Sequence, residues 1–172
     1  GWPIAVDTFR MRCAAQPEFP PSSIGEVYVQ PHGVFAEFVE GEILSALGED
    51  EQEFLIRTSF LEYFNSDVAR AVSGREDCWQ ILEGLLRRGL LDQSEDETYH
   101  CHRLLRLILE QKLRRRGSVH LSRLRKLAAE SLSAQGALKR ALQCAAPAGD
   151  VGFCTRLFLD AGGILIGLGE GL

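Results

Sequence analysis

The sequence predicts a mainly α fold of short helices, interrupted once by a small β-hairpin and ending in antiparallel helix pairs. Three observations support this prediction. Apolar residues recur at helical spacing through most of the 172 residues. Glycines and capping residues divide that pattern into short segments. Only residues 90–101 have the pattern of two strands joined by a turn.

The first quarter of the chain is expected to hold two helices and a loop. Pro3 favours the first turn of a helix over 3–15, because a missing N–H costs nothing at that position. The proline-rich stretch 16–24 predicts a loop. Apolar residues within 34–47 fall on one helical stripe, and Gly48 is expected to cap the C-terminus of that helix.

Three short helices are expected next, ending near residues 59, 72 and 88. Side chains suited to N-caps precede the second and third of these helices, and a glycine follows each. The capping candidates are Asn65 or Ser66 with Gly74, and Asp77 with Gly89.

Residues 90–101 are then expected to form a hairpin, with a polar turn at 94–97 between two strands. A helix over 102–116 follows. Five leucine and isoleucine residues between 104 and 109 leave it few polar faces, so we expect this helix to be central and buried on several sides.

The last third of the chain predicts three helices, over 118–135, 137–146 and 150–161. Ser118 and Asp150 are the expected N-caps of the first and third. Short turns between the helices favour antiparallel packing, as in helical-repeat arrays. The glycine-rich residues 162–172 are expected to be either a continuation cut short or a frayed end.

Three helices, a hairpin and a long helix follow one another in the order of a winged-helix unit. We therefore expect three parts: residues 1–48, the end of a helical module; residues 49–117, a winged-helix-like domain; and residues 118–172, the start of a TPR-like helical-repeat domain.

Composition places the chain among ordinary folded proteins, with 45% hydrophobic and 25% charged residues and a net charge of −5. No apolar stretch approaches the roughly 18 residues that a membrane helix needs. The five cysteines are an odd set without CxxC spacing, which argues against a disulfide framework. We therefore expect a cytoplasmic protein.

The basic residues are concentrated late in the chain, since residues 101–172 hold twelve Arg and Lys against five Asp and Glu. Some of them could face nucleic acid, namely Arg114, Arg115, Arg116, Arg123, Arg125 and Lys126. The same charges suit a helix C-terminus and a solvated helix face, and no aromatic residue is interleaved to stack on bases. In the second helix of the winged unit, where a reading helix would lie, the only bases are Arg70 and Arg75.

Catalytic machinery is not recognisable in the sequence. It lacks GxxxxGK[ST], GxGxxG after a strand, GxSxG and HExxH, so we expect no enzyme. The trio His100-Cys101-His102 suggests a metal site, but on a strand the two histidines share one face while Cys101 points to the other. We therefore expect no metal. At a strand-to-helix junction, the ring N–H of His102 can donate to a phosphate or a backbone carbonyl; a capping or core histidine is the alternative.

Several segments resemble, in order and spacing, one family: the large ATP-dependent LuxR-type transcriptional regulators of the maltose-regulon activator group. These regulators belong to the signal-transduction NTPases with numerous domains (STAND). The resemblance extends over nearly the whole chain. The matching segments are GWPIA at 1–5, FLIRTSFL at 54–61, ILEGLLRRGLL at 81–91, YHCHRLL at 99–105, and more loosely 120–135 and 141–150.

The resemblance implies a bacterial regulator built in a fixed order: NTPase core, helical module, winged helix, helical-repeat sensor and a DNA-binding helix-turn-helix. This chain would be a non-catalytic central segment that couples the nucleotide state of the core to the sensor and the DNA-binding domain. Its partners would be the NTPase and DNA-binding domains of its own protein, with a small-molecule effector or a protein partner on the helical repeats. It would contact no membrane, and it would reach DNA only through a domain outside this chain.

The family also implies where a nucleotide would be contacted. The chain itself would hold no cofactor, whereas the full-length protein would bind ATP and ADP. Gly1 and Pro3 match the motif whose proline packs near the adenine, and His102 matches a winged-helix histidine that reaches a phosphate in the ADP-bound form. The alternative function is a self-contained winged-helix DNA-binding protein.

Overall fold

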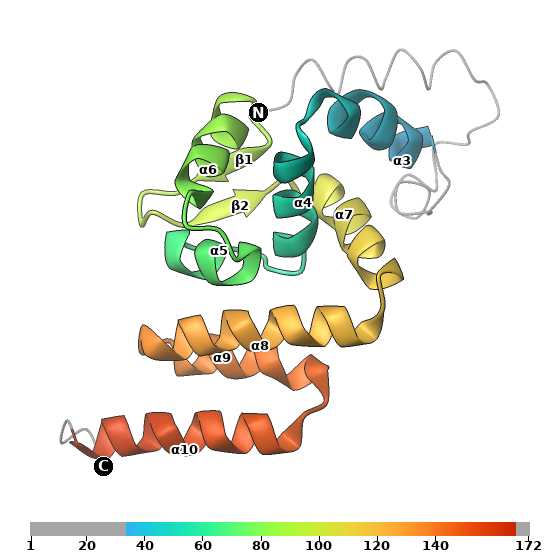
Figure 1. Cartoon of the computed structure of the whole chain (residues 1–172). Coiled ribbons are helices and arrows are strands. Elements are labelled where there is room, and N and C mark those ends of the chain that lie inside the picture. The colour runs from blue at the N-terminus through green and yellow to red at the C-terminus, as the bar shows by residue number, and fades with distance from the viewer. Residues whose placement is uncertain (1–33, 168–172) are drawn as a thin grey trace, which may run out of the picture.

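A computed structural model describes the fold of residues 34–167 and the side chains of residues 36–160 (Figure 1). This part of the chain is mainly helical, with one two-stranded antiparallel sheet, so the predicted fold class is confirmed. A helical unit that includes the hairpin lies above three stacked helices in this view. The predicted helix over 3–15 and the predicted loop over 16–24 lie outside the described residues, as do Gly1 and Pro3.

The first described stretch is helical, but its geometry changes along its length. Helix α3 (Val34–Phe38) continues as the π-helical turn η2 (Val39–Ile43) and the 3₁₀ turn η3 (Leu44–Ala46). The apolar stripe predicted within 34–47 is confirmed at its described positions, since Phe38, Val39 and Leu47 are buried and Ile43 packs against the core.

The predicted role of Gly48 as a C-terminal cap is wrong. The extended backbone of Leu47 ends η3, and Gly48 is the N-cap of the next helix, α4 (Glu49–Thr58), with φ of −64°. Its N–H donates to the Glu51 carboxylate at 3.1 Å. No left-handed residue is needed here because the 3₁₀ turn has already tightened the end of the preceding helix.

The next two helices end as predicted. Helix α5 (Ser66–Ser73) is capped by Asn65, whose side-chain oxygen accepts from the Val68 N–H at 3.1 Å, and Gly74 follows in the left-handed conformation. Helix α6 (Cys78–Arg87) has Asp77 at its N-cap position. The Asp77 carboxylate binds the Arg75 guanidinium instead of a helix N–H, and this hydrogen bonding lowers the pKa of the Asp77 carboxyl.

The predicted hairpin is confirmed, and it is tied to the helices by a third backbone segment. Strand β1 (Leu91–Gln93) pairs antiparallel with β2 (Tyr99–Cys101), with Asp92 opposite His100. Phe64, in the α4–α5 connection, exchanges backbone hydrogen bonds of 3.0 and 2.7 Å with Tyr99, and the two rings stack at 6.0 Å. The hairpin is therefore fixed against the α4–α5 connection.

Helix α7 (Arg103–Arg115) is central, as its leucine-rich sequence predicts. Leu105, Leu109 and Leu113 are fully buried, and the helix packs against α4 and α8. At its far end the Lys112 ammonium lies 2.8 Å from the Glu40 carboxylate of η2. This helix therefore joins the N-terminal helical stretch to the remainder of the fold.

Three helices complete the described chain: α8 (Ser118–Ala134), α9 (Leu138–Ala145), which continues into the 3₁₀ turn η4 (Ala146–Ala148), and α10 (Val151–Gly167). Asp150 caps α10 as predicted, accepting from the Phe153 N–H at 2.9 Å. Hydrogen bonding from Lys126 and from this N–H lowers the pKa of the Asp150 carboxyl.

Two predictions about these helices are corrected. Ser118 is the first residue of α8 and not its cap, because Gly117 occupies the N-cap position. Helix α10 runs to Gly167 and not to residue 161, so the described part of the glycine-rich tail is helical. Glycine costs a helix only about 1 kcal/mol relative to alanine and keeps its N–H, so a helix can continue through it.

The joint between α7 and α8 generates a first prediction. Gly117 has φ of +105° and ψ of 149°, a conformation that side chains other than glycine's rarely adopt. A Cβ atom there would meet nothing within 4 Å, so the backbone conformation alone would resist it. We expect Gly117→Ala to lower the free energy of unfolding by about 1–3 kcal/mol in urea titrations.

The matched control is Gly41→Ala. Gly41 also has open space around its Cβ position, but it lies in the helical turn η2 without a positive φ. We expect that variant to be neutral or slightly more stable. An equal loss of stability in both variants would contradict the assignment of strain to Gly117.

A second prediction concerns Cys101, which packs against the core from β2. Burial raises the pKa of its thiol from 9.0 to about 12. Between these pH values the unfolded chain loses this proton and the folded chain keeps it, so the free energy of unfolding falls as pH rises through that window. Urea unfolding at pH 8 and pH 10.5 should show this fall, and Cys101→Ala should reduce it. An unchanged slope in Cys101→Ala would contradict the burial of the thiol.

Candidate functional site

The histidine predicted as a phosphate contact lies where the sequence places it, between β2 and α7. His102 is the N-cap residue of α7, with φ of −51° and ψ of 130°, and it is exposed. Its carbonyl accepts the Arg106 N–H at 3.0 Å, which is the first hydrogen bond of the helix. The start of a helix favours negative charge nearby, so the position suits an anionic ligand.

His102 lines a pocket of about 460 Å³. Three parts of the fold build its wall: the α4–α5 connection, the hairpin and the first turn of α7. The lining residues are Glu62, Tyr63, Asp92, His100, Cys101, His102, Arg103 and Arg106. Basic and acidic side chains therefore line the same cavity.

Only some of the charged side chains in this pocket form ion pairs. The Nε2 atom of His100 lies 3.8 Å from the carboxylate of Asp92, its cross-strand partner. Arg103 and Arg106 form no ion pair with any carboxylate of the described residues. Neither arginine was predicted from the sequence, although Arg106 follows His102 by four residues, a spacing that places two side chains on the same face of a helix.

In the His100-Cys101-His102 trio the two histidines and the cysteine point to opposite sides, as the alternation along a strand predicts. His102 is exposed and His100 is half-buried, whereas Cys101 packs against the core and burial raises the pKa of its thiol to about 12. A protonated, buried thiol is a poor metal ligand and a poor nucleophile. Within the described residues there is no group of three His, Cys, Asp or Glu side chains that could hold a metal ion.

Most of the basic residues considered for nucleic acid are engaged inside the protein. Arg114 lies 2.7 Å from Glu110, and Arg116 lies 2.6 Å from Glu53. Lys126 binds Asp150, from α8 to the N-cap of α10. Arg115 and Arg123 are exposed.

The basic residues considered for the candidate DNA-recognition helix also form ion pairs with carboxylates. Arg70 lies 3.3 Å from Asp67, and Arg75 contacts both Asp50 and Asp77. These bases are partly neutralised by neighbouring carboxylates, so they offer little net charge to phosphates.

A second region unforeseen from the sequence joins the winged-helix unit to α8 and α9. The Arg125 guanidinium lies 5.2 Å from the centre of the Phe60 ring, and the Arg140 guanidinium lies 5.9 Å from the centre of the Tyr63 ring. Arg140 also donates to the Tyr63 carbonyl at 2.9 Å. We call the contacts of Arg125 and Arg140 with the α4–α5 connection the junction.

The junction has an apolar and a polar component as well. Helix α8 packs along α5, and the buried side chains on both sides belong to one core. The Asn65 amide, whose oxygen caps α5, donates its N–H to the Gln135 side chain at 2.6 Å. Cation–π contacts and buried apolar area together resist separation of the two helical groups.

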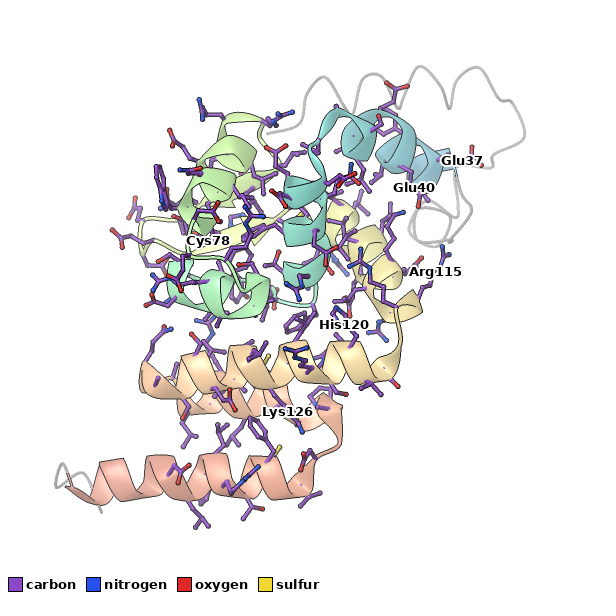
Figure 2. The ribbon with its side chains drawn as sticks, viewed as in Figure 1. Glu37, Glu40, Cys78, Arg115, His120 and Lys126 are labelled. Carbon is purple, nitrogen blue, oxygen red and sulfur yellow. The ribbon has the colours of Figure 1, made fainter. Side chains whose placement is uncertain are left out.

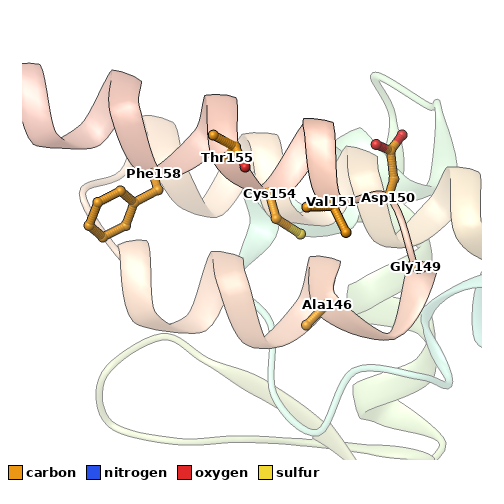
Figure 3. Close-up of a pocket in the computed structure, with 7 residues that line it drawn as sticks. All are labelled: Ala146, Gly149, Asp150, Val151, Cys154, Thr155 and Phe158. Carbon is orange, nitrogen blue, oxygen red and sulfur yellow. The ribbon is translucent and has the colours of Figure 1, made fainter.

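Two other pockets occur in the described chain. One of about 600 Å³ lies at the junction, between the hairpin turn, Tyr63 and Arg140. The other, of about 390 Å³, lies where η4 turns into α10 and is shown in Figure 3. Its wall is largely apolar, with Val151, Cys154 and Phe158 projecting from α10. No described helix has both the length and the apolar character needed to cross a membrane.

Comparison with known proteins identifies the domain in the middle of the chain. Residues 40–121 match the MalT winged helix domain. The HTH-type transcriptional regulator MalT of Cronobacter sakazakii is 28% identical over 128 residues, which cover 73% of this chain and 14% of that protein. The regulator of the same name from Yersinia enterocolitica is 30% identical with the same coverage.

A third relative extends the match along the chain. The regulator MalT of Vibrio cholerae is 25% identical over 173 residues, covering 99% of this chain and 19% of that protein. The chain thus spans between a seventh and a fifth of the length of these relatives. Residues 40–121 therefore form a MalT-like winged-helix domain, and the chain is similar to a segment of the HTH-type transcriptional regulators named MalT.

Proposed function

We propose that this segment couples the nucleotide state of an NTPase core, elsewhere in the same protein, to a helical-repeat sensor and a DNA-binding domain. The observation that carries the proposal is one hydrophobic core whose residues extend along the chain from Ala36 to Leu157. That core joins the wall of the His102 pocket to α8 and α9 without an intervening linker. A displacement at the pocket would therefore be transmitted to the helices beyond it.

In this proposal His102 donates a ring N–H to a phosphate of bound ADP. His102 is exposed, and its N-cap position places it at the surface between β2 and α7. Gly1 and Pro3 would pack near the adenine, as the family resemblance implies. A hydrogen bond made only with one nucleotide state biases the position of the winged helix, since a ligand shifts an equilibrium by its differential affinity.

The junction would transmit a change in the position of the winged helix to α8 and α9. Arg125 and Arg140 each pair with an aromatic ring of the α4–α5 connection, next to Glu62 and Tyr63 of the pocket wall. We propose residues 1–48, 49–117 and 118–172 as the end of an NTPase-associated helical module, the winged-helix domain and the start of the TPR-like domain. The repeats would receive an effector or a protein partner, and the protein would act in the cytoplasm as a regulator and not through catalysis by this segment.

ADP retention in the full-length protein tests the role of His102. We expect His102→Ala to speed ADP release by about tenfold or more, because a hydrogen bond to a charged group contributes about 1.5–3 kcal/mol. The measurement is the dissociation rate of a fluorescent ADP analogue. His102→Asn, which keeps an N–H donor, should restore part of the retention. Equal ADP release rates in wild type and His102→Ala would contradict the proposed contact between His102 and the nucleotide.

Binding to duplex DNA tests the alternative, a self-contained winged-helix DNA-binding protein. The exposed bases Arg115 and Arg123 favour it, and the internal ion pairs of the other bases oppose it. We expect the 172-residue chain to leave a random-sequence duplex unshifted in an electrophoretic assay at low salt. A salt-sensitive shift, reduced by Arg115→Gln and Arg123→Gln together, would support DNA binding by this segment instead.

A further inference from the structure

We infer that Arg106 is a second anion-binding residue of the His102 pocket, and that together the two side chains form a site for a phosphoryl group of a nucleotide. This inference rests on the proposed function, because it extends the nucleotide contact from His102 to a residue that the family resemblance does not assign. Its support comes from three observations: the position of Arg106, its partial burial and its lack of an ion pair among the described residues.

Position is the first argument. Arg106 follows His102 by one helical turn, as the 3.0 Å hydrogen bond from its N–H to the His102 carbonyl shows. Residues four apart lie on the same face of a helix. Both side chains line the same pocket of about 460 Å³. An anion that reached the ring of His102 would therefore also meet the guanidinium of Arg106.

Charge pairing is the second argument. In the winged-helix region nearly every basic side chain lies within ion-pair distance of a carboxylate; these are Arg57, Arg70, Arg75, Arg87, Arg88, Lys112, Arg114 and Arg116. Among the residues of this region that the structure describes, the exceptions are Arg103, Arg106 and Arg115. Two of the three exceptions line the His102 pocket.

Burial distinguishes Arg106 from the other two. Arg103 and Arg115 are exposed, so water solvates their guanidinium groups, whereas Arg106 is partly buried. A partly desolvated cation without a counter-ion is energetically unfavourable, and an incoming anion would relieve that cost. The planar guanidinium presents paired N–H donors that match two phosphate oxygens.

The acidic side chains of the pocket set the strength of this site. Glu62 and Asp92 balance the formal charges of Arg103 and Arg106, and His100 faces Asp92 across the hairpin. A single phosphoryl group would therefore bind weakly unless another domain held the remainder of the nucleotide. Such weak binding suits a contact that forms only when the NTPase core presents its nucleotide.

The test uses the 172-residue chain and inorganic pyrophosphate as the probe. Titration at constant ionic strength, followed by ¹H–¹⁵N NMR, should move resonances of the pocket with a Kd of about millimolar. Arg106→Gln should raise that Kd by about tenfold or more. Arg115→Gln is the matched control, since this exposed arginine lies at the opposite end of α7, as Figure 2 shows, and its Kd should equal that of wild type.

Arg106→Lys provides a second variant if Arg106→Gln fails to fold. It keeps the charge and loses the paired donors, so we expect an intermediate Kd. Absence of pyrophosphate shifts in wild type, shifts confined to other regions, or equal Kd values in wild type and the Arg106 variants would overturn the inference.

This outcome is separable from that of the proposed function. If His102→Ala leaves ADP release unchanged while Arg106→Gln weakens pyrophosphate binding, the anion site stands and the nucleotide switch fails. If His102→Ala speeds ADP release while the Arg106 variants bind pyrophosphate with the Kd of wild type, the proposed function stands and the assignment of Arg106 is wrong.

Discussion

The contact between Phe64 and Tyr99 positions the candidate site. Their two backbone hydrogen bonds and stacked rings attach a short hairpin to the α4–α5 connection, and Phe64 is buried against Phe54 of α4. A two-stranded hairpin is marginal by itself, so this attachment supplies the support it lacks. It also brings Glu62 and Tyr63 opposite the segment that carries His100 and His102, which creates the pocket.

Ion pairing distinguishes the pocket from the remainder of the winged-helix unit. Elsewhere in the unit the arginine and lysine side chains other than Arg115 pair with carboxylates, and these surface pairs individually contribute little stability. Their collective effect is to leave little unneutralised positive charge on the surface that a DNA-binding winged helix would use. The pocket differs, because Asp92 pairs with His100 and neither Arg103 nor Arg106 lies within ion-pair distance of a carboxylate of the described residues.

Regulation by such a segment requires mechanical continuity, and the junction supplies a physical basis for it. Arg125 and Arg140 both contact aromatic rings of the α4–α5 connection, the same connection that forms one wall of the pocket. Helix α8 packs on α5 within a shared core, and only Gly117 separates α8 from the capping residue of α7. Tightly packed interiors transmit strain, so the pocket and the α8–α9 pair are placed to move together.

The sequence by itself determined the order of the helices, the hairpin, most of the caps and the position of His102, because hydrophobic period, capping residues and glycines act over a few residues. Its errors at Gly48, Ser118 and the end of α10 are also local, and they concern helix ends, where several geometries cost nearly the same. Only the tertiary structure decided which charges pair and which rings meet. Arg106 and Glu62, or Arg140 and Tyr63, are brought together by packing between distant segments, and no short-range pattern records such contacts.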